Sequence, residues 1–183
     1  MLQQGAHAPD FTDPIGLLRA CHGRVEHFAG LALRLADHPL EPVPAEPVQQ
    51  AAGQVLRYFE QAAPLHHADE EQDLLPRLRA RLPGPPAAEL EALLAGLAAE
   101  HAALDARWAE LRPFLEALRD GRPVSPDAYR EAAAAFQAAQ ADHLGRENAR
   151  ILPAAEAHLT AADRAAMGAA MARRRGVGQN RDG

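Results

Sequence analysis

Hydrophobic residues recur at a helical spacing along most of the chain, and the first such run begins just after residue 12. Asp13 is a favoured helix N-cap, and Pro14 fits the first helical position because its missing N–H would be unpaired there anyway. The run ends at Asp37-His38-Pro39, where the proline stops a helix. The helical rhythm in between is carried by Ile15, Leu18, His22, Val25, Leu33 and Leu35.

A second helical run follows a proline-rich break. The stretch 39–47 holds four prolines and is therefore expected to form a connecting loop. The pattern then predicts a helix over about residues 48–82. Pro64 is expected to kink this helix, and Pro76 to perturb it again, because proline removes a backbone donor and crowds the preceding turn.

Two more long helices complete the pattern. Pro83-Gly84-Pro85-Pro86 is a break, and the apolar spacing after it predicts a helix over about residues 87–119. Ser125-Pro126 starts a fourth helix, with serine as the cap, and this helix runs to about residue 158. Four long helices with short loops predict an all-α fold, an antiparallel up-down-up-down four-helix bundle.

The chain ends are expected to differ from this bundle. Residues 1–12 are polar and resemble an arm, and residues 13–158 are expected to form the bundle. Thr160 and Asp163 could cap a short fifth helix over 161–174, although its Ala-rich sequence offers little apolar surface for docking. The remainder of residues 159–183 is expected to be a flexible tail, with the Arg173-Arg174-Arg175 cluster solvated.

Composition supports a helical protein and excludes several partners. The 183 residues favour one domain, and 48% are hydrophobic, many of them alanine, whereas only 4% are aromatic. A net charge of −6 gives no excess of positive charge that would attract nucleic acid or an anionic membrane. No apolar run approaches the roughly 20 residues of a membrane span, and no secretion signal starts the chain, so a cytoplasmic location is expected.

One phrase occurs twice and carries the candidate chemistry. His66 is followed four residues later by Glu70, and His143 is followed four residues later by Glu147. In both copies a proline comes six residues after the glutamate, with two aliphatic residues just before it. Residues four apart share a helix face, so each copy directs an imidazole and a carboxylate at one spot. Two facing copies would enclose a cation.

The donor types narrow the identity of that cation. A mixed shell of imidazole and carboxylate favours iron or manganese over calcium, while zinc is a further candidate. The chain has a single cysteine, Cys21, which excludes a disulfide framework and a cysteine-rich zinc or iron–sulfur site. Its expected state is a buried inert thiol.

Two further histidines lie near the middle of the first and third predicted helices, among aliphatic residues. His22 and His101 are therefore candidate ligands from those helices, with a hydrogen-bonded core histidine as the alternative. His67 is turned by about 100° from His66 and is expected to lie beside the ligands or on the surface, with bridging as the alternative. The remaining histidines, His7, His27, His38 and His158, are expected to face away from the centre.

Several acidic residues flank the candidate ligands. Glu100 or Asp105 could accept a hydrogen bond from a ligand imidazole and fix its tautomer. The alternative for these two, and for Asp69, Glu71 and Glu26, is a solvated helix face. Tyr58, two turns before His66, could line the site or pack in the core.

This set of residues resembles the hemerythrin-like family of HHE cation-binding domains. The resemblance covers residues 13–158 and rests on His22, His66-x-x-x-Glu70, His101 and His143-x-x-x-Glu147, with their Leu-Leu-Pro and Ile-Leu-Pro ends. It implies a bundle around a non-haem, oxygen-bridged di-iron centre, in which Glu70 and Glu147 bridge the irons and the four histidines are terminal ligands.

The chain departs from the oxygen-carrying hemerythrins in two places. Those proteins have two histidines four apart on the third helix, whereas Leu97 and Asp105 stand four residues before and after His101. Their fourth helix carries a histidine and an aspartate five apart, whereas this chain has His143 and Glu147. The departures imply an open coordination position and resemble the regulatory and sensory members more than the carriers.

Three functions remain open from the sequence. The first is a protein that binds O2 or a related small ligand such as NO, or that senses iron or redox state, acting through self-association as a homodimer or through an unknown protein partner. The second is a di-iron enzyme acting on peroxide, nitric oxide or iron. The third is a metal-free interaction bundle, which the buried histidines and carboxylates disfavour because they would lack a compensating charge.

Overall fold

A computed structural model describes residues 9–82 and 88–177, and within these ranges the chain is helical with no strand. The all-helical prediction is therefore confirmed. The elements are α1 (Pro14–Leu35), α2 (Glu46–Gln61), α3 (Ala63–Asp69), η1 (Glu70–Leu74), α4 (Leu75–Arg81), α5 (Ala88–Arg119), α6 (Pro126–Arg146), η2 (Glu147–Ile151), α7 (Leu152–His158) and α8 (Ala161–Arg174).

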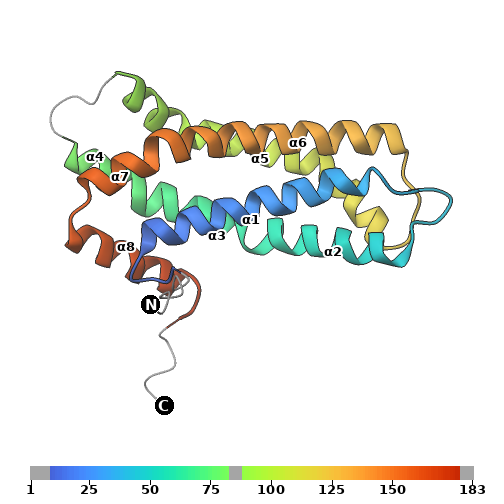
Figure 1. Cartoon of the computed structure of the whole chain (residues 1–183), viewed down its shortest axis with the longest axis horizontal. Coiled ribbons are helices and arrows are strands. Elements are labelled where there is room, and N and C mark those ends of the chain that lie inside the picture. Colours follow the sequence, from blue (N-terminus) through green and yellow to red (C-terminus); the bar gives the residue numbers. More distant parts are fainter. Residues whose placement is uncertain (1–8, 83–87, 178–183) are drawn as a thin grey trace, which may run out of the picture.

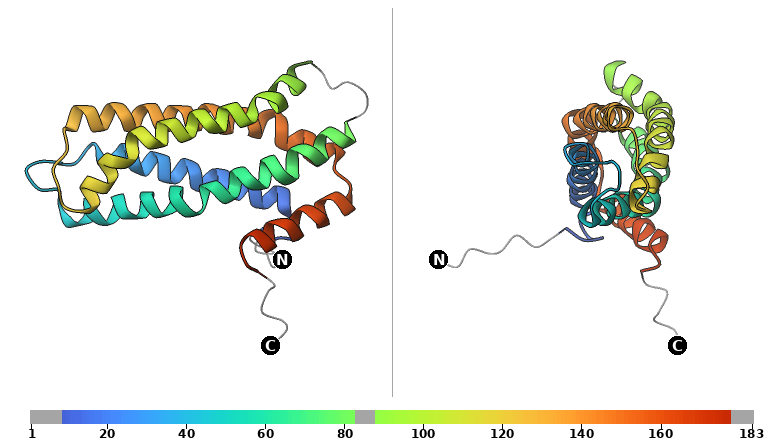
Figure 2. Two further views of the ribbon diagram at one scale, coloured as in Figure 1. Left: turned by 180° about the vertical axis from the view of Figure 1, so that it is seen from behind. Right: turned by 90° about the vertical axis from the view of Figure 1, so that its right-hand side faces the viewer.

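The helices form four long rods that lie side by side, with α8 at one end (Figures 1 and 2). The first rod is α1, and the second joins α2, α3, η1 and α4 end to end. The third rod is α5, and the fourth joins α6, η2 and α7. Helices α1 and α5 each pack against both α2 and α6, so the four rods enclose a common interior. None of the described helices is long and apolar enough to cross a membrane.

The predicted starts and breaks of the helices agree with the structure. The side chains of Asp13 and Ser125 accept hydrogen bonds from the backbone of the first turns of α1 and α6. The second rod is interrupted at Ala62, one residue after α2 ends, and Pro64 lies in the first turn of α3. The division into an arm, a bundle and a tail stays a prediction, and residues 1–8, the 83–86 break and residues 178–183 lie outside the described ranges.

Each repeated phrase contains a turn of π-helix that begins at its glutamate. These turns are η1, starting at Glu70, and η2, starting at Glu147. The backbone N–H groups of Leu75 and Leu152 donate to the carbonyl oxygens of Glu70 and Glu147, five residues back. The proline that follows each turn has no N–H and crowds the carbonyl four residues before it, which the wider π turn relieves. Pro76 therefore perturbs its helix as predicted, in the form of a wide turn at the site glutamate.

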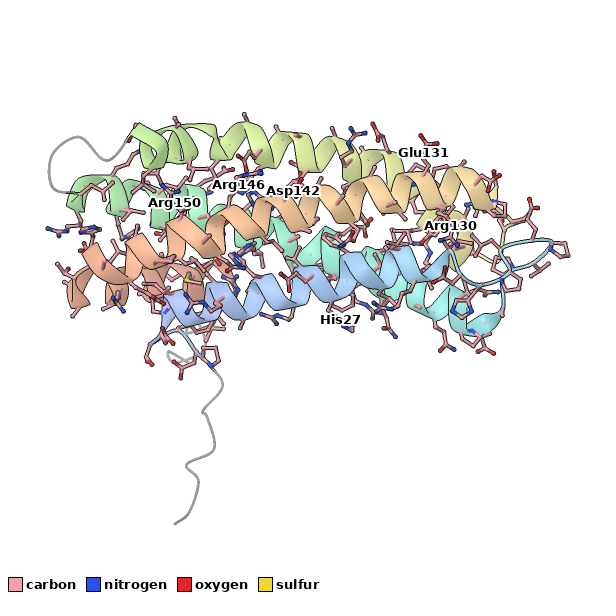
Figure 3. The ribbon with its side chains drawn as sticks, turned by 45° about the horizontal axis from the view of Figure 1, so that its top comes forward. His27, Arg130, Glu131, Asp142, Arg146 and Arg150 are labelled. Carbon is pink, nitrogen blue, oxygen red and sulfur yellow. The ribbon has the colours of Figure 1, made fainter. Side chains whose placement is uncertain are left out.

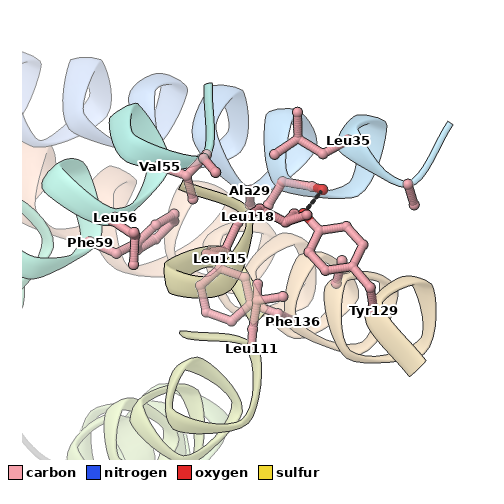
Figure 4. Close-up of a cluster of buried hydrophobic side chains, with 14 of the residues drawn as sticks. Ala29, Leu35, Val55, Leu56, Phe59, Leu111, Leu115, Leu118, Tyr129 and Phe136 are labelled. Atoms are coloured by element: carbon pink, nitrogen blue, oxygen red, sulfur yellow. Dashed lines mark hydrogen bonds between the residues drawn. The ribbon is translucent and has the colours of Figure 1, made fainter. Parts of the chain in front are cut away.

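Two apolar clusters occupy the two ends of the interior. The larger cluster includes Val55, Phe59, Leu115 and Phe136 (Figure 4), and the smaller cluster includes Ile15, Leu74, Leu97 and Ile151. On α1, His22 stands between Leu18 of the smaller cluster and Val25 of the larger one, and His101 on α5 stands in a similar place. The candidate site is thus a polar layer between two apolar layers.

The larger cluster also anchors the loop end of α6. Tyr129 is fully buried, and its hydroxyl donates a 2.6 Å hydrogen bond to the carbonyl oxygen of Ala32 on α1 (Figure 4). Burial raises the pKa of Tyr129 well above its ordinary value, so the hydroxyl stays a donor. This bond fixes α6 against α1 at the end of the four rods that lies farthest from α8.

Helix α8 docks more firmly than its alanine-rich sequence suggested. Thr160 and Asp163 form the predicted capping box. Met167 and Met171 are fully buried in the smaller cluster, and a Cβ at Gly168 would overlap the carbonyl oxygen of Phe11. The expectation that α8 has little apolar surface is therefore wrong. Two buried methionines and the close approach of Gly168 to the backbone of Phe11 hold α8 against the rest of the fold.

Candidate metal centre

The structure brings all six predicted ligand residues together in the interior. His66 and Glu70 come from α3 and η1, and His143 and Glu147 come from α6 and η2, so the two copies of the repeated phrase face each other. The exposed fractions are 1% for His22, 2% for His66, 0% for Glu70, 3% for His101, 2% for His143 and 1% for Glu147. Whether these residues ligate a metal stays a prediction, but their convergence is a property of the fold.

The six residues form two overlapping groups of four. One group is His22, His66, Glu70 and Glu147, and the other is Glu70, His101, His143 and Glu147. Within each group the potential ligand atoms lie within 4.8 Å of one another. Both carboxylates belong to both groups, whereas each pair of histidines belongs to one. The arrangement has room for two cations that share the two glutamates.

Interatomic distances show how the carboxylates lie between the two pairs of imidazoles. Glu70 Oε1 is 3.2 Å from His66 Nε2 and 3.5 Å from His22 Nε2, while Glu70 Oε2 is 3.4 Å from His101 Nε2. Glu147 Oε2 is 3.3 Å from His22 Nε2 and 3.4 Å from His143 Nε2. Each carboxylate therefore contacts imidazoles of both groups.

Several buried atoms of this layer lack hydrogen-bond partners in the described part of the chain. A buried polar atom without a partner costs about 1–3 kcal/mol, and more if it is charged. A divalent cation would compensate for the carboxylate oxygens and for one nitrogen of each imidazole, because its ligands are lone pairs of carboxylate and neutral imidazole. The atoms are His66 Nδ1 and Nε2, Glu70 Oε2, His101 Nε2, His143 Nε2, and Glu147 Oε1 and Oε2.

Outer hydrogen bonds turn three of the imidazoles so that Nε2 faces the centre. The Nδ1–H of His22 donates to Asn148 Oδ1 at 2.8 Å, and that of His101 donates to Glu71 Oε1 at 2.6 Å. An imidazole that donates from Nδ1 presents the lone pair of Nε2, which is the form that binds a metal. Glu71 and Asn148 each directly follow a glutamate of the repeated phrase, so both acceptors lie in the π turns η1 and η2.

The fourth helix uses a different acceptor. His143 Nδ1 donates to Glu100 Oε2 at 3.0 Å, and Arg146 donates to the same oxygen at 2.8 Å. Arg146 lies on α6, one turn from His143 (Figure 3). The predicted hydrogen bond from a candidate ligand histidine to Glu100 is confirmed. Asp105 has no such bond and is exposed.

Sequence reasoning missed Asn148 and considered Glu71 as no more than a flanking charge. The signal that could have found them is their matching position, because each is the residue after the glutamate of a repeated phrase. Glu71 reaches the histidine of α5, and Asn148 reaches the histidine of α1.

Burial separates the pKa values of the two shared glutamates. Burial raises the pKa of Glu70, but its close contacts with His66, His101 and His22 outweigh burial and hold the pKa well below its usual range. Burial, the charge of Glu70 and the charge of Glu100 raise the pKa of Glu147 to about 10. Without a cation, Glu147 therefore keeps a proton at neutral pH, and a bound cation would have to displace it.

The histidine pKa values follow from the same surroundings. Burial lowers the pKa of His66 to about 4, and burial also lowers the pKa of His143. For His101, burial lowers the pKa, but the nearby carboxylates of Glu70 and Glu71 outweigh burial and raise it. Two of the four imidazoles are thus neutral at pH 7 before any cation binds.

His67 lies against the site without pointing at its centre. Its ring stacks on that of His101, with centroids 3.9 Å apart and planes 6° from parallel. A metal lies in the plane of the imidazole that binds it, so two stacked rings cannot both ligate one ion. His67 can group with His101 and His143 by distance, but its orientation makes it a support for the His101 ring. Burial and the charge of His101 lower its pKa to about 3.

The other histidines lie away from this layer, as expected. His27 is exposed on the outer side of α1 (Figure 3), His38 is exposed after α1, and His158 is half-buried at the end of α7. His7 lies outside the described residues. Tyr58 packs in the core, where it stacks on Phe28 with centroids 4.4 Å apart. Cys21 is a buried free thiol, as expected.

Two arginines of the C-terminal helix bind carboxylates beside the site. Arg174 contacts Asp69 and also donates to Asp73 Oδ2 at 2.7 Å. Arg175 Nη2 donates to Asp69 Oδ2 at 2.6 Å. Asp69 is fully buried and directly precedes Glu70, and Asp73 lies in the π turn η1. The interpretation of this arginine cluster as a solvated tail is wrong for Arg174 and Arg175.

Comparisons with known proteins agree with this site. A family model described as the hemerythrin HHE cation binding domain matches residues 13–155, which include all six site residues. An uncharacterized protein of Haemophilus influenzae is 33% identical over 108 residues, which cover 59% of this chain and 60% of that relative. The match thus spans about 60% of the length of this relative. Because the family model covers well over half of the chain, the protein belongs to the hemerythrin HHE cation-binding family.

Proposed function

We propose that the protein holds two iron ions in this layer and uses them to bind a small molecule such as O2, NO or peroxide. The observation that carries the proposal is the pair of four-residue groups that share Glu70 and Glu147. The unpaired nitrogen and oxygen atoms of the same layer support it, and they count against a metal-free interaction bundle.

The donor set favours iron over the other candidates. Each group offers two imidazole nitrogens and two carboxylates, a mixed shell of the kind found in non-haem iron sites. Manganese is the second candidate because it accepts the same carboxylates, whereas a structural zinc site is usually a closed tetrahedron around one ion. Four protein donors leave positions open at an ion that takes six ligands. Iron would supply reversible electron transfer and an open position for the small molecule.

The surroundings suit a binding protein whose centre is shielded from water. We place the layer in an antiparallel four-helix bundle, which the packing of α1 and α5 against both α2 and α6 supports. Apolar clusters lie on both sides along the bundle axis and limit access of solvent. The hydrogen bonds that three imidazoles donate to Asn148, Glu71 and Glu100 keep the rings oriented before a metal arrives, so little reorganisation is needed on binding.

Metal analysis of matched variants tests the proposal. Protein expressed with ample iron is expected to contain about two irons per chain, the number of groups in the layer, with a near-ultraviolet oxo-bridge absorption band. The His66→Ala, His143→Ala double variant is expected to lose both. The His27→Ala, His38→Ala double variant removes two exposed histidines and is expected to keep both. A folded protein that takes up no iron would refute the proposal.

A further inference from the structure

A small cavity lies beside the metal layer, on the side of His101 and His143. Its volume is about 30 Å³, and it lies between the α2–α3 junction, α5 and α6. Aromatic side chains of Phe59, Trp108 and Phe136 form part of its wall, and the polar residues that line it include His67, Asp105 and Gln140. A water molecule needs about 10–15 Å³ of such volume, so the cavity has room for a molecule of two or three heavy atoms.

Gln140 is a buried amide that lines this cavity without a protein partner. It is 4% exposed and lies on α6, one turn before His143. Its side chain forms no hydrogen bond with any described residue, although an amide has two donors and two acceptor lone pairs. Its amide atoms are not among the fully buried unpaired atoms of the described residues, so they border space that a small molecule can reach. A molecule with an oxygen or nitrogen atom in the cavity would hydrogen-bond to this amide.

His67 separates the cavity from the metal layer. It lines the cavity and at the same time stacks on the ring of His101. One of its ring nitrogens lies within 4.8 Å of ring nitrogens of both His101 and His143. A molecule in the cavity would thus be one side chain away from the Nε2 atoms of this half of the centre.

The lining also limits the charge of the occupant. The exposed carboxylate of Asp105 lies on the outer side of the cavity and repels anions. The phenyl rings of Phe59 and Phe136 offer no polar partner to a charged molecule, and burial of an unpaired charge is costly. Gln140 can both donate and accept a hydrogen bond, which suits a neutral small molecule with an oxygen or nitrogen atom, such as dioxygen or NO.

We propose that this cavity is a binding site for a neutral molecule of two or three heavy atoms, with Gln140 and His67 as its polar contacts. It is the position that such a molecule occupies before it reaches the His101–His143 half of the centre. The second statement rests on the proposed function, whereas the existence of the site does not.

The single tryptophan of the chain provides a direct test on metal-free protein. Trp108 lines the cavity, so dissolved dioxygen that enters the cavity quenches its fluorescence. Ala63 also lines the cavity, and Ala63→Leu fills it. The quenching constant for dioxygen is expected to fall about twofold or more in this variant, as roughly three added carbons occupy most of a space of this size. Iodide, an anion, is expected to quench both proteins equally.

Matched variants make this test decisive. Ala106→Leu adds the same side chain at an exposed position of α5 and is expected to leave dioxygen quenching unchanged. If Ala63→Leu prevents folding, as circular dichroism would show, Ala63→Val gives a smaller filling and a smaller decrease. Equal dioxygen quenching in the wild type and in a folded filled variant would overturn the site.

A second measurement tests the position of the site next to the centre. With iron(II)-loaded protein, the rate of NO association is expected to fall about tenfold in Ala63→Leu, with iron content unchanged. An unchanged NO rate in the filled variant would overturn the route. If the protein binds no iron, the proposed function fails, but the quenching result on metal-free protein still decides whether the cavity is a site.

Discussion

Removing the two arginines that bind Asp69 is expected to destabilise the protein more than any exposed substitution. In the Arg174→Ala, Arg175→Ala variant, the carboxylate of Asp69 stays fully buried while both of its charged partners are lost. Leaving one charge of a buried pair without a partner costs about 3–5 kcal/mol. The two arginine side chains are 18% and 21% exposed, so water can partly replace them, and a loss of about 3 kcal/mol is expected.

Urea unfolding of the metal-free protein measures this change as a free energy of unfolding. Arg173→Ala is the matched control, because Arg173 is exposed and has no ionic partner among the described residues; its effect should stay within about 0.5 kcal/mol. Adding Asp69→Asn to the double variant removes the unpaired charge and is expected to restore about 1–2 kcal/mol. A double variant as stable as the control, or a triple variant less stable than the double, would refute the reasoning.

Three further substitutions or conditions test other parts of the structure. Asn148→Leu removes the acceptor of His22 and is expected to weaken metal binding about 10–100-fold by equilibrium dialysis, while Asn148→Asp retains most of the affinity. Tyr129→Phe leaves the buried Ala32 carbonyl oxygen without this donor and should lower the free energy of unfolding by about 1–2 kcal/mol, measured in urea. Because the pKa of Glu147 is raised to about 10 in the metal-free fold, the folded state binds a proton that the unfolded state releases, so stability is lost as pH rises toward that value. The free energy of unfolding should fall between about pH 7 and about pH 9, by at most about 1.4 kcal/mol per pH unit, and much less in Glu147→Gln.

Four of the six site residues could be paired from the sequence because their geometry is local. Spacing on one helix fixes which residues share a face, so His66 with Glu70 and His143 with Glu147 could be paired from the sequence alone. The caps at Asp13 and Ser125 are local in the same sense. The helix boundaries therefore agree to within a few residues wherever the structure describes them.

Contacts between helices could not be predicted in this way. Whether Glu71 reaches His101 depends on how two rods are rotated about their own axes, which no spacing within one helix determines. The docking of α8 depends on the close approach of Gly168 to the backbone of Phe11. The cavity beside His67 is space that the side chains of the packed helices leave unfilled. The sequence carries no direct signal for such a space.

The outer acceptors make the two halves of the centre chemically unequal. His101 and His143 donate to carboxylates of Glu71 and Glu100, whereas His22 donates to the neutral amide of Asn148 and His66 Nδ1 has no partner. A carboxylate that accepts from Nδ1 makes an imidazole a more basic ligand. His101 and His143 would therefore be the more electron-donating ligands to a bound ion, and they lie on the side of the layer that faces the cavity.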